Sequence, residues 1–284
     1  MRLILFITLM STYLFGVISL PMNTPILSIN DEQVTTATLE GVQVGMYGAI
    51  IRRFDESHST ALSWAEITKI DGSTTTLALK PILTLEQNAL PTGKWTPKVG
   101  DEVIIGYNYQ RALLIAPNSS IYNKITRYHN NRQWVHPDIF TAALSAEGHP
   151  TPIKEDFSRT CRLNNIGLVF FMFDKSIITV DCHSFKILEN KSTSIRAEDI
   201  QLPFYSRVPH IEANWFGEGS SEMTSYAPHY IELLAENNSD NKWIQSYKQH
   251  REEAVEKNDE SWLDSLLSPL LNTFEIETEN FEED

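Results

Sequence analysis

Two His-Pro steps, His136-Pro137 and His149-Pro150, are the residues of this sequence that most invite a chemical interpretation. Imidazole is a common metal ligand and general base, so two histidines on neighbouring turns could serve either role. The same residues also fit the ends of a helix, because proline suits the first helical position and Gly148 suits a C-terminal stop. Pro150 cannot continue a helix. The local pattern therefore favours helix boundaries over a metal site.

A zinc site could be assembled on paper from Glu147, His149, Asp181 and His183. Zinc motifs, however, place their ligands at characteristic intervals, and the sequence contains neither His-Glu-x-x-His nor Cys-x-x-Cys. We therefore expect no metal and no cofactor.

The run Asp181-Cys182-His183 places a thiol beside an imidazole, the pair that a cysteine hydrolase uses. Adjacent residues on a strand point to opposite faces, so Cys182 and His183 are poorly placed to act as nucleophile and base. We interpret the run as the polar end of a strand and expect no enzymatic activity. The only other cysteine, Cys161, lies in a predicted helix, and the spacing leaves open whether the two form a disulfide or remain buried thiols.

The N-terminal residues 1–20 have the layout of a secretory signal peptide. Arg2 precedes an apolar run from Leu3 to Leu20, and small residues around Ser19 suit cleavage. An uncleaved membrane anchor is the alternative, because the run is just long enough to span a bilayer. We expect export to the periplasm or the cell surface, with outer-membrane association, and no transmembrane span after signal removal.

The composition excludes one class of partner. The chain has 284 residues, a formal net charge of −14, 42% hydrophobic residues and 10% aromatic residues. Nucleic-acid binding needs clustered Lys and Arg, so nucleic acid is not an expected partner. A protein partner that presents cations suits this charge better.

Residues 21–117 are predicted to form a β-rich domain. Short β-branched and aromatic runs alternate with turn signals, among them Asp71-Gly72, a strong hairpin signal between two strand-like runs. Several such strands in one stretch predict a small β-barrel.

Residues 118–235 are predicted to form an α+β domain. Helices are expected from Asn118 or Ser119, from Pro137, and from Thr151-Pro152. The run 166–173 is apolar on both faces of a strand and needs cover on both sides, so the helices should pack on this sheet.

Residues 236–284 are predicted to be a helical and acidic C-terminal extension. Lys242–Lys257 has a helical pattern, and the last ten residues carry six acids and no base. On this helix Lys248 and Glu252 lie four residues apart, as do Glu253 and Lys257, with Arg251 between them. Such pairs are usually a solvated helix face. The alternative is a cation and an anion that together imitate a zwitterionic ligand, which makes Lys248, Arg251, Glu252 and Lys257 candidate partner-binding residues.

Five segments together resemble a known family. They are RALLIAPN (111–118), VHPDIFTAALSAEGHPTPIKEDF (135–157), IGLVFF (166–171), VDCHSFKIL (180–188) and PFYSRV (203–208). They are similar to the plasminogen-binding N-terminal domain family, exported and surface proteins of epsilon-class Gram-negative bacteria. The resemblance implies a non-enzymatic binding protein that captures host plasminogen through lysine-dependent contacts. The alternative is a periplasmic structural or assembly factor of the envelope that does not bind plasminogen.

The resemblance also implies a role for lysine, because capture in that family is attributed particularly to a C-terminal lysine. A terminal lysine offers an ammonium and a carboxylate from one residue. This sequence ends in Asp284 and has no Lys or Arg after Lys257. Three expectations remain open: internal lysines such as Lys248 bind, proteolysis after Lys257 exposes a new terminus, or the chain does not bind plasminogen.

Overall fold

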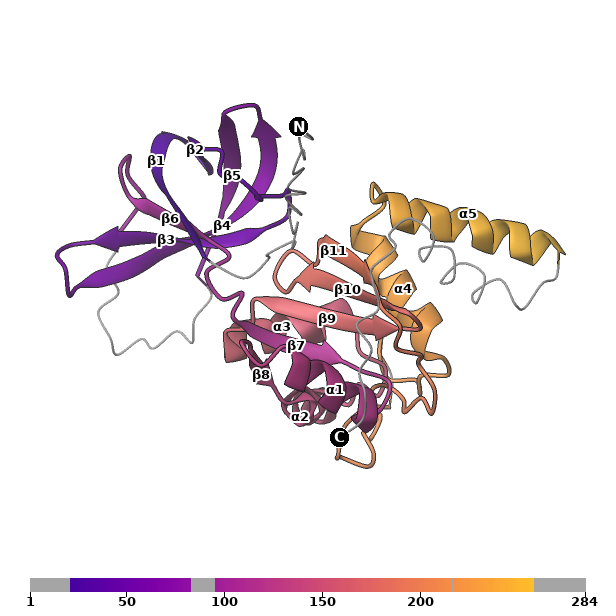
Figure 1. The fold of residues 1–284 in the computed structure, drawn as a ribbon. Helices are drawn as coiled ribbons and strands as arrows, with labels where there is room; N and C mark the ends of the chain where they lie inside the picture. Colours follow the sequence, from indigo (N-terminus) through magenta and orange to yellow (C-terminus); the bar gives the residue numbers. More distant parts are fainter. Residues whose placement is uncertain (1–20, 83–94, 216, 258–284) are drawn as a thin grey trace, which may run out of the picture.

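The computed structural model describes residues 21–82, 95–215 and 217–257, arranged as a β-barrel beside a sheet covered by helices (Figure 1). The predicted signal peptide (1–20) and the acidic end of the C-terminal extension (258–284) lie outside the described residues. Within the described residues, no helix is both long enough and apolar enough to cross a membrane.

The first unit is a closed barrel of six antiparallel strands in the order β1-β2-β5-β4-β3-β6. The strands are β1 (Met22–Asn30), β2 (Gln33–Ala37), β3 (Tyr47–Arg53), β4 (Ser59–Asp71), β5 (Thr74–Lys80) and β6 (Glu102–Ile105). Closure leaves no open sheet edge, because β6 pairs with both β1 and β3. The predicted barrel is confirmed.

Local sequence explains the hairpin of β4 and β5 in the barrel. Asp71-Gly72 connects β4 to β5, and Gly72 has a φ of 54°, a left-handed conformation that glycine adopts without strain. Along β4 the side chains alternate, so that Ala65 and Ile67 are completely buried while their neighbours are partly exposed. This period of two is what places one face of each strand inside the barrel.

The second unit is built on a five-stranded mixed sheet in the order β11-β10-β9-β7-β8. Its strands are β7 (Arg111–Ile115), β8 (Gln133–Val135), β9 (Leu168–Phe173), β10 (Ser176–Asp181) and β11 (Ile187–Ser192). β7 is parallel to both of its neighbours, whereas β9, β10 and β11 form an antiparallel meander. Residues 111–115 lie within the range 21–117 predicted for the β-rich domain, but among the described pairings this strand pairs only within the second sheet.

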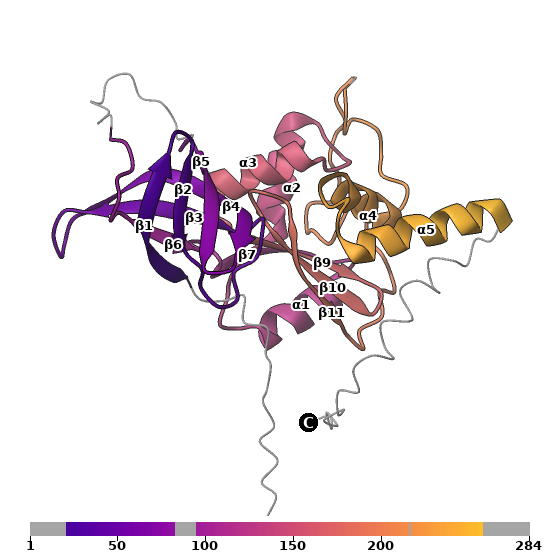
Figure 2. The ribbon, with the colours of Figure 1, turned by 90° about the horizontal axis from the view of Figure 1, so that it is seen from above.

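Helices cover the second sheet on both faces, as the apolar run at 166–173 requires (Figure 2). They are α1 (Ser119–Tyr128), α2 (Pro137–Glu147), α3 (Lys154–Asn164), α4 (Tyr226–Asn237) and α5 (Lys242–Lys257). One core joins α2, α3, α4 and α5 to one face of the sheet. A second core joins α1 and the opposite face to the barrel interior. The predicted α+β fold class is confirmed.

The helix boundaries follow the caps that the sequence offers, with one correction. The side chain of Asn118 caps α1 by accepting from the N–H of Ile121 at 2.9 Å. Gly148 ends α2 with a φ of 69°. The helix expected from Thr151-Pro152 begins instead at Lys154. Proline at 152 disfavours helical geometry in Thr151, whose N–H donates to the carbonyl of Gly219.

Candidate functional site

His136 has a structural role at the start of α2. It is the residue that caps the helix, and its Nδ1 accepts from the N–H of Asp138 at 3.2 Å. Its ring also packs against the edge of Tyr122, with the ring centroids 5.3 Å apart. The predicted boundary role of this histidine is confirmed.

His149 has a structural role between α2 and α3. Its Nδ1 lies 2.9 Å from the carboxylate of Asp156, which also accepts from the N–H of Ile153 at 3.0 Å. Asp156 is buried, so this pair ties the connection to the first turn of α3. No group of three His, Cys, Asp or Glu side chains among the described residues is arranged to hold a metal ion.

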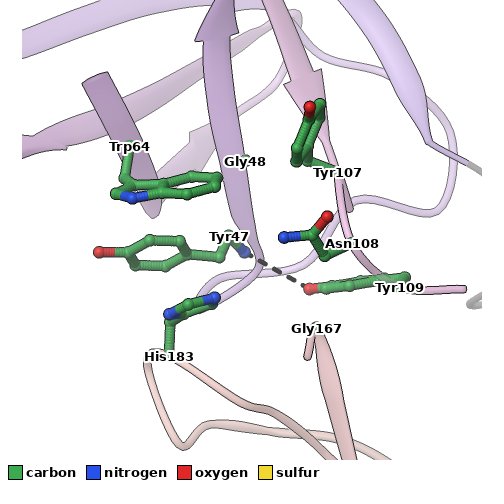
Figure 3. Close-up of a pocket in the computed structure, with 8 residues that line it drawn as sticks. All are labelled: Tyr47, Gly48, Trp64, Tyr107, Asn108, Tyr109, Gly167 and His183. Carbon is green, nitrogen blue, oxygen red and sulfur yellow. Dashed lines mark hydrogen bonds between the residues drawn. The ribbon is translucent and has the colours of Figure 1, made fainter. Parts of the chain in front are cut away.

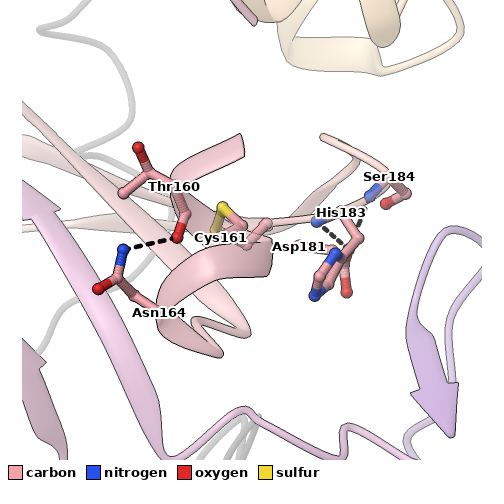
Figure 4. Close-up of a disulfide and its surroundings, with 7 residues drawn as sticks. Thr160, Cys161, Asn164, Asp181, His183 and Ser184 are labelled. Carbon is pink, nitrogen blue, oxygen red and sulfur yellow. Dashed lines mark hydrogen bonds between the residues drawn. A yellow bond between two sulfur atoms is a disulfide. The ribbon is translucent and has the colours of Figure 1, made fainter. Parts of the chain in front are cut away.

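Cys161 and Cys182 form a disulfide, which settles the question that the sequence left open (Figure 4). The bond joins α3 to the residue after β10, and the two Cα atoms are 5.9 Å apart. Both residues are completely buried. A bonded sulfur is not a free nucleophile, so the structure leaves no role for Cys182 in a cysteine–histidine pair.

Asp181, the residue before Cys182, accepts four hydrogen bonds from three separate segments of the chain. The hydroxyl of Tyr109 donates at 2.7 Å and the N–H of Tyr47 at 3.1 Å. The N–H groups of His183 and Ser184 donate at 2.9 and 2.8 Å. Burial raises the pKa of Asp181, and these four donors oppose the rise because they favour the ionised carboxylate.

Three aromatic rings, those of Tyr47, Trp64 and His183, gather at the same place, where the barrel meets the second sheet (Figure 3). The ring of Tyr47 is 4.8 Å from the ring of His183, and Trp64 stacks on His183 at 5.7 Å. Burial, and to a smaller extent the positive charge of Arg162, lowers the pKa of His183 to about 4. The imidazole is therefore neutral near pH 7 and stacks as an uncharged ring. We call Tyr47, Trp64, Tyr109, Asp181 and His183 the junction.

The junction encloses too little space for a substrate. Its cavity is about 10 Å³, bounded also by Tyr107 and Asn108. Holding a single water molecule requires about 10–15 Å³ measured in this way. The arrangement therefore joins two parts of the chain and does not form a binding pocket in this conformation.

A larger groove lies beside α2. It has a volume of about 200 Å³ and is bounded by Thr141 of α2, the segment 201–211 and the pair Glu222-Met223. Nothing in the sequence analysis pointed to it, because its walls come from irregular segments that carry no periodic pattern.

The sequence-predicted binding residues lie on α5 and are not brought together with the junction. Ile244 and Tyr247 bury one face of α5, and Lys248 is exposed. The guanidinium of Arg251 lies 2.5 Å from the carboxylate of Glu232 on α4. The helix includes Glu252 and Lys257, whose side chains lie outside the described residues.

Sequence reasoning missed the junction because its members have no recognisable spacing. Asp181 was interpreted as the polar end of a strand, but it is completely buried. Its partners Tyr47 and Tyr109 are 134 and 72 residues away in the chain. The one local signal is the run Asp181–Ser184, in which a carboxylate accepts from the next two N–H groups in a turn.

Comparisons with known proteins point to one protein family. Residues 21–234, more than half of the chain, match the family described as plasminogen-binding protein pgbA N-terminal. The plasminogen-binding protein PgbA of Helicobacter pylori strain J99 is 24% identical over 196 residues, which are 68% of this chain and 43% of that protein. PgbA of strain 26695 is 23% identical over 196 residues, 68% of this chain and 42% of that protein.

The matched region thus spans less than half the length of either relative. No solved structure matches the chain. The barrel, the sheet, the helices α1 to α3 and the greater part of α4 lie within the matched range, which ends at residue 234. On this extent of match, the chain belongs to the family described as plasminogen-binding protein pgbA N-terminal.

Proposed function

We propose that this chain is an exported, non-enzymatic binding protein that captures host plasminogen through lysine-dependent contacts. Family membership over residues 21–234 is the observation that carries the proposal, because both relatives are named for this binding. The signal-peptide pattern of residues 1–20 supports export to the periplasm or the cell surface. The structural partners of His136, His149 and Cys182 support a role without catalysis.

Lys248 on α5 is the lysine that we assign to this contact. It is exposed, and no ion pair or hydrogen bond joins it to another described residue. Ile244 and Tyr247 anchor the helix to the core, so Lys248 is presented from a fixed backbone. Along a helix, residues four apart are separated by about 6 Å of axial rise, which places residue 252 one turn away. A lysine-binding pocket needs an ammonium and a carboxylate at such a fixed separation.

Arg251 is a weaker candidate than Lys248. Its guanidinium is already paired with Glu232, and a plasminogen pocket would have to replace that contact. We therefore expect Arg251 to orient α5 on α4 and Lys248 to make the contact.

Binding of the full chain to immobilised plasminogen, with and without a lysine analogue, tests the proposal. We expect the analogue to abolish binding, and Lys248→Ala to weaken it by about tenfold to a hundredfold, because a charge-assisted contact contributes about 1.5–3 kcal/mol. Lys124→Ala is the matched control, since Lys124 is an exposed helical lysine on α1. A chain truncated after Lys257 tests whether a new C-terminal lysine binds more tightly.

Two results would contradict the proposal. The first is no binding by either the full or the truncated chain, which would favour an envelope structural or assembly factor. The second is binding that the lysine analogue does not compete. Equal losses in Lys248→Ala and Lys124→Ala would reject Lys248 as the specific contact and indicate a diffuse charge effect.

A further inference from the structure

The groove beside α2 has an apolar floor and an acidic edge. Phe204, Ile211 and Met223 form the floor and are 1%, 5% and 9% exposed. Pro150, Pro203 and Pro209 also line it. Glu222 is the acidic residue among the lining groups, and it is exposed.

Three of the other polar side chains that line the groove already have partners, and the fourth, His210, is exposed. Thr141 donates to the carbonyl of Pro137 at 3.1 Å, and Gln201 donates to the carbonyl of Ser206 at 2.9 Å. The hydroxyl of Ser206 donates to Asp138 at 3.2 Å. By contrast, Glu222 has no ion pair or hydrogen bond with another described residue. Its carboxylate therefore remains available to a ligand.

The size of the groove limits what it can hold. A volume of about 200 Å³ exceeds the space of a few water molecules, each of which occupies about 30 Å³ in the liquid. It falls below the range of about 300–1,000 Å³ that is typical of small-molecule and cofactor pockets. The volume of the groove therefore suits a single large side chain of a partner protein.

The charge around the groove selects the kind of side chain. Residues 208–241 contain six acidic residues and no Lys or Arg. Glu212, Glu218 and Glu222 are all exposed, and none forms an ion pair with a described residue. Carboxylates that share one loop and have no cationic partner attract a cation.

The same charges argue against two other occupants. Residues 258–284 of this chain contain no Lys or Arg, so they would place like charges together. A second copy of a chain with net charge −14 meets the same repulsion.

We propose that this groove is a docking site for an extended segment of a partner protein, which inserts one arginine side chain. The aliphatic part of the arginine packs on the apolar floor, and its guanidinium pairs with Glu222. This site is separate from Lys248, because no residue of α5 lines the groove, and it accepts a cation instead of presenting one.

Titration calorimetry of the full chain tests the proposal with the probe peptide acetyl-Pro-Leu-Arg-Leu-Pro-amide. A peptide with citrulline in place of arginine keeps the shape and removes the charge. We expect the arginine peptide to bind at least tenfold more tightly than the citrulline peptide. Glu222→Gln should remove that difference, since it replaces the carboxylate by a neutral group of the same shape.

Glu218→Gln is the matched control, because it removes a charge from the same loop at a residue outside the groove lining. Val208→Trp tests whether the peptide occupies the groove, since Val208 lines it and a larger side chain at this half-buried position fills it. We expect Glu218→Gln to bind the arginine peptide like the wild type. Val208→Trp should lose this binding while its circular dichroism spectrum stays native.

Several outcomes would overturn the proposal. These are no binding of the arginine peptide at millimolar concentration, equal binding of the citrulline peptide, and equal weakening by Glu218→Gln and Glu222→Gln. Spermidine, which carries three ammonium groups along an aliphatic chain, separates a small ligand from a protein segment. Spermidine binding as tight as that of the arginine peptide, and equally sensitive to Glu222→Gln, would reject the protein partner.

Discussion

At the scale of single residues, Asp181 ties together three separate segments of the chain. It accepts from Tyr47, Tyr109, His183 and Ser184 and is completely buried. A buried carboxylate without donors would cost several kcal/mol, whereas each donor to a charged group recovers about 1.5–3 kcal/mol. The residue therefore acts as a fixed point on which three segments of the chain converge.

His183 makes the stability of the junction depend on pH. Its pKa is about 4 in the folded chain, compared with the ordinary value of 6.5. Between these values the unfolded chain binds the proton and the folded chain does not, so the free energy of unfolding falls as the pH drops from 6.5 to 4. The groups that face His183 are Tyr47 and Trp64, with Arg162 and the buried Asp181 nearby.

We expect the free energy of unfolding of the wild type to fall by about 2–3 kcal/mol between pH 6.5 and pH 4 because of His183, allowing for the partly exposed ring. His183→Phe keeps a stacked ring and removes the titration. Denaturant unfolding of both proteins across this range measures the effect, and the variant should lose less stability than the wild type by that amount. Parallel pH profiles would show that His183 does not carry the dependence.

At the scale of elements, sequence patterns predicted those features that local chemistry determines. The Asp71-Gly72 hairpin, the cap at Asn118 and the span of α5 are each set by neighbouring residues, and the structure has all three. The sheet to which β7 belongs could not be predicted in the same way. An apolar run such as 111–115 specifies a buried strand, but not the sheet in which it pairs.

The candidate sites depended even more on tertiary contacts. The junction joins residues from both units, and the groove is lined largely by irregular segments. Neither has a spacing that could be recognised. The pairing of Cys161 with Cys182 likewise required α3 to lie against the end of β10, which no local pattern encodes.

The disulfide is the element-scale feature whose removal is easiest to measure. It closes a loop with a sequence separation of 21 residues. Constraining such a loop in the unfolded chain stabilises the fold by about 3 kcal/mol. The double variant Cys161→Ala/Cys182→Ala should therefore unfold at a lower denaturant concentration, with a loss of about that size.

Reduced wild-type protein is the control, because it opens the same loop without changing the sequence. It should lose a similar amount of stability at the same pH. If the double variant were as stable as the oxidised wild type, the bond would contribute nothing to the fold.

At the scale of the whole molecule, the barrel and the sheet share one of the two hydrophobic cores. Val34 and Leu77 of the barrel belong to the same buried cluster as Leu168 and Met172 of β9. Hydrogen bonds at the junction add to this shared core. A barrel that packs its core continuously with a neighbouring sheet gains little by folding alone, so the two parts should fold as one cooperative unit.

We therefore expect a single calorimetric transition for the wild type, with equal calorimetric and van't Hoff enthalpies. The double variant Tyr109→Phe/Ser184→Ala removes two hydroxyl contacts across the junction, the bond from Tyr109 to Asp181 at 2.7 Å and the bond from Ser184 to the carbonyl of Gly45 at 2.6 Å. Together these losses should lower Tm by about 5–10 °C, at about 2–4 °C per kcal/mol, and bring the van't Hoff enthalpy below the calorimetric one.

Ser63→Ala is the matched control, since its hydroxyl bonds only within the barrel, at the carbonyls of Trp64 and Lys80. It should lower Tm without separating the enthalpies, because it weakens one unit and leaves the contacts between the two in place. Two resolved transitions in the wild type would show that the shared core does not couple them.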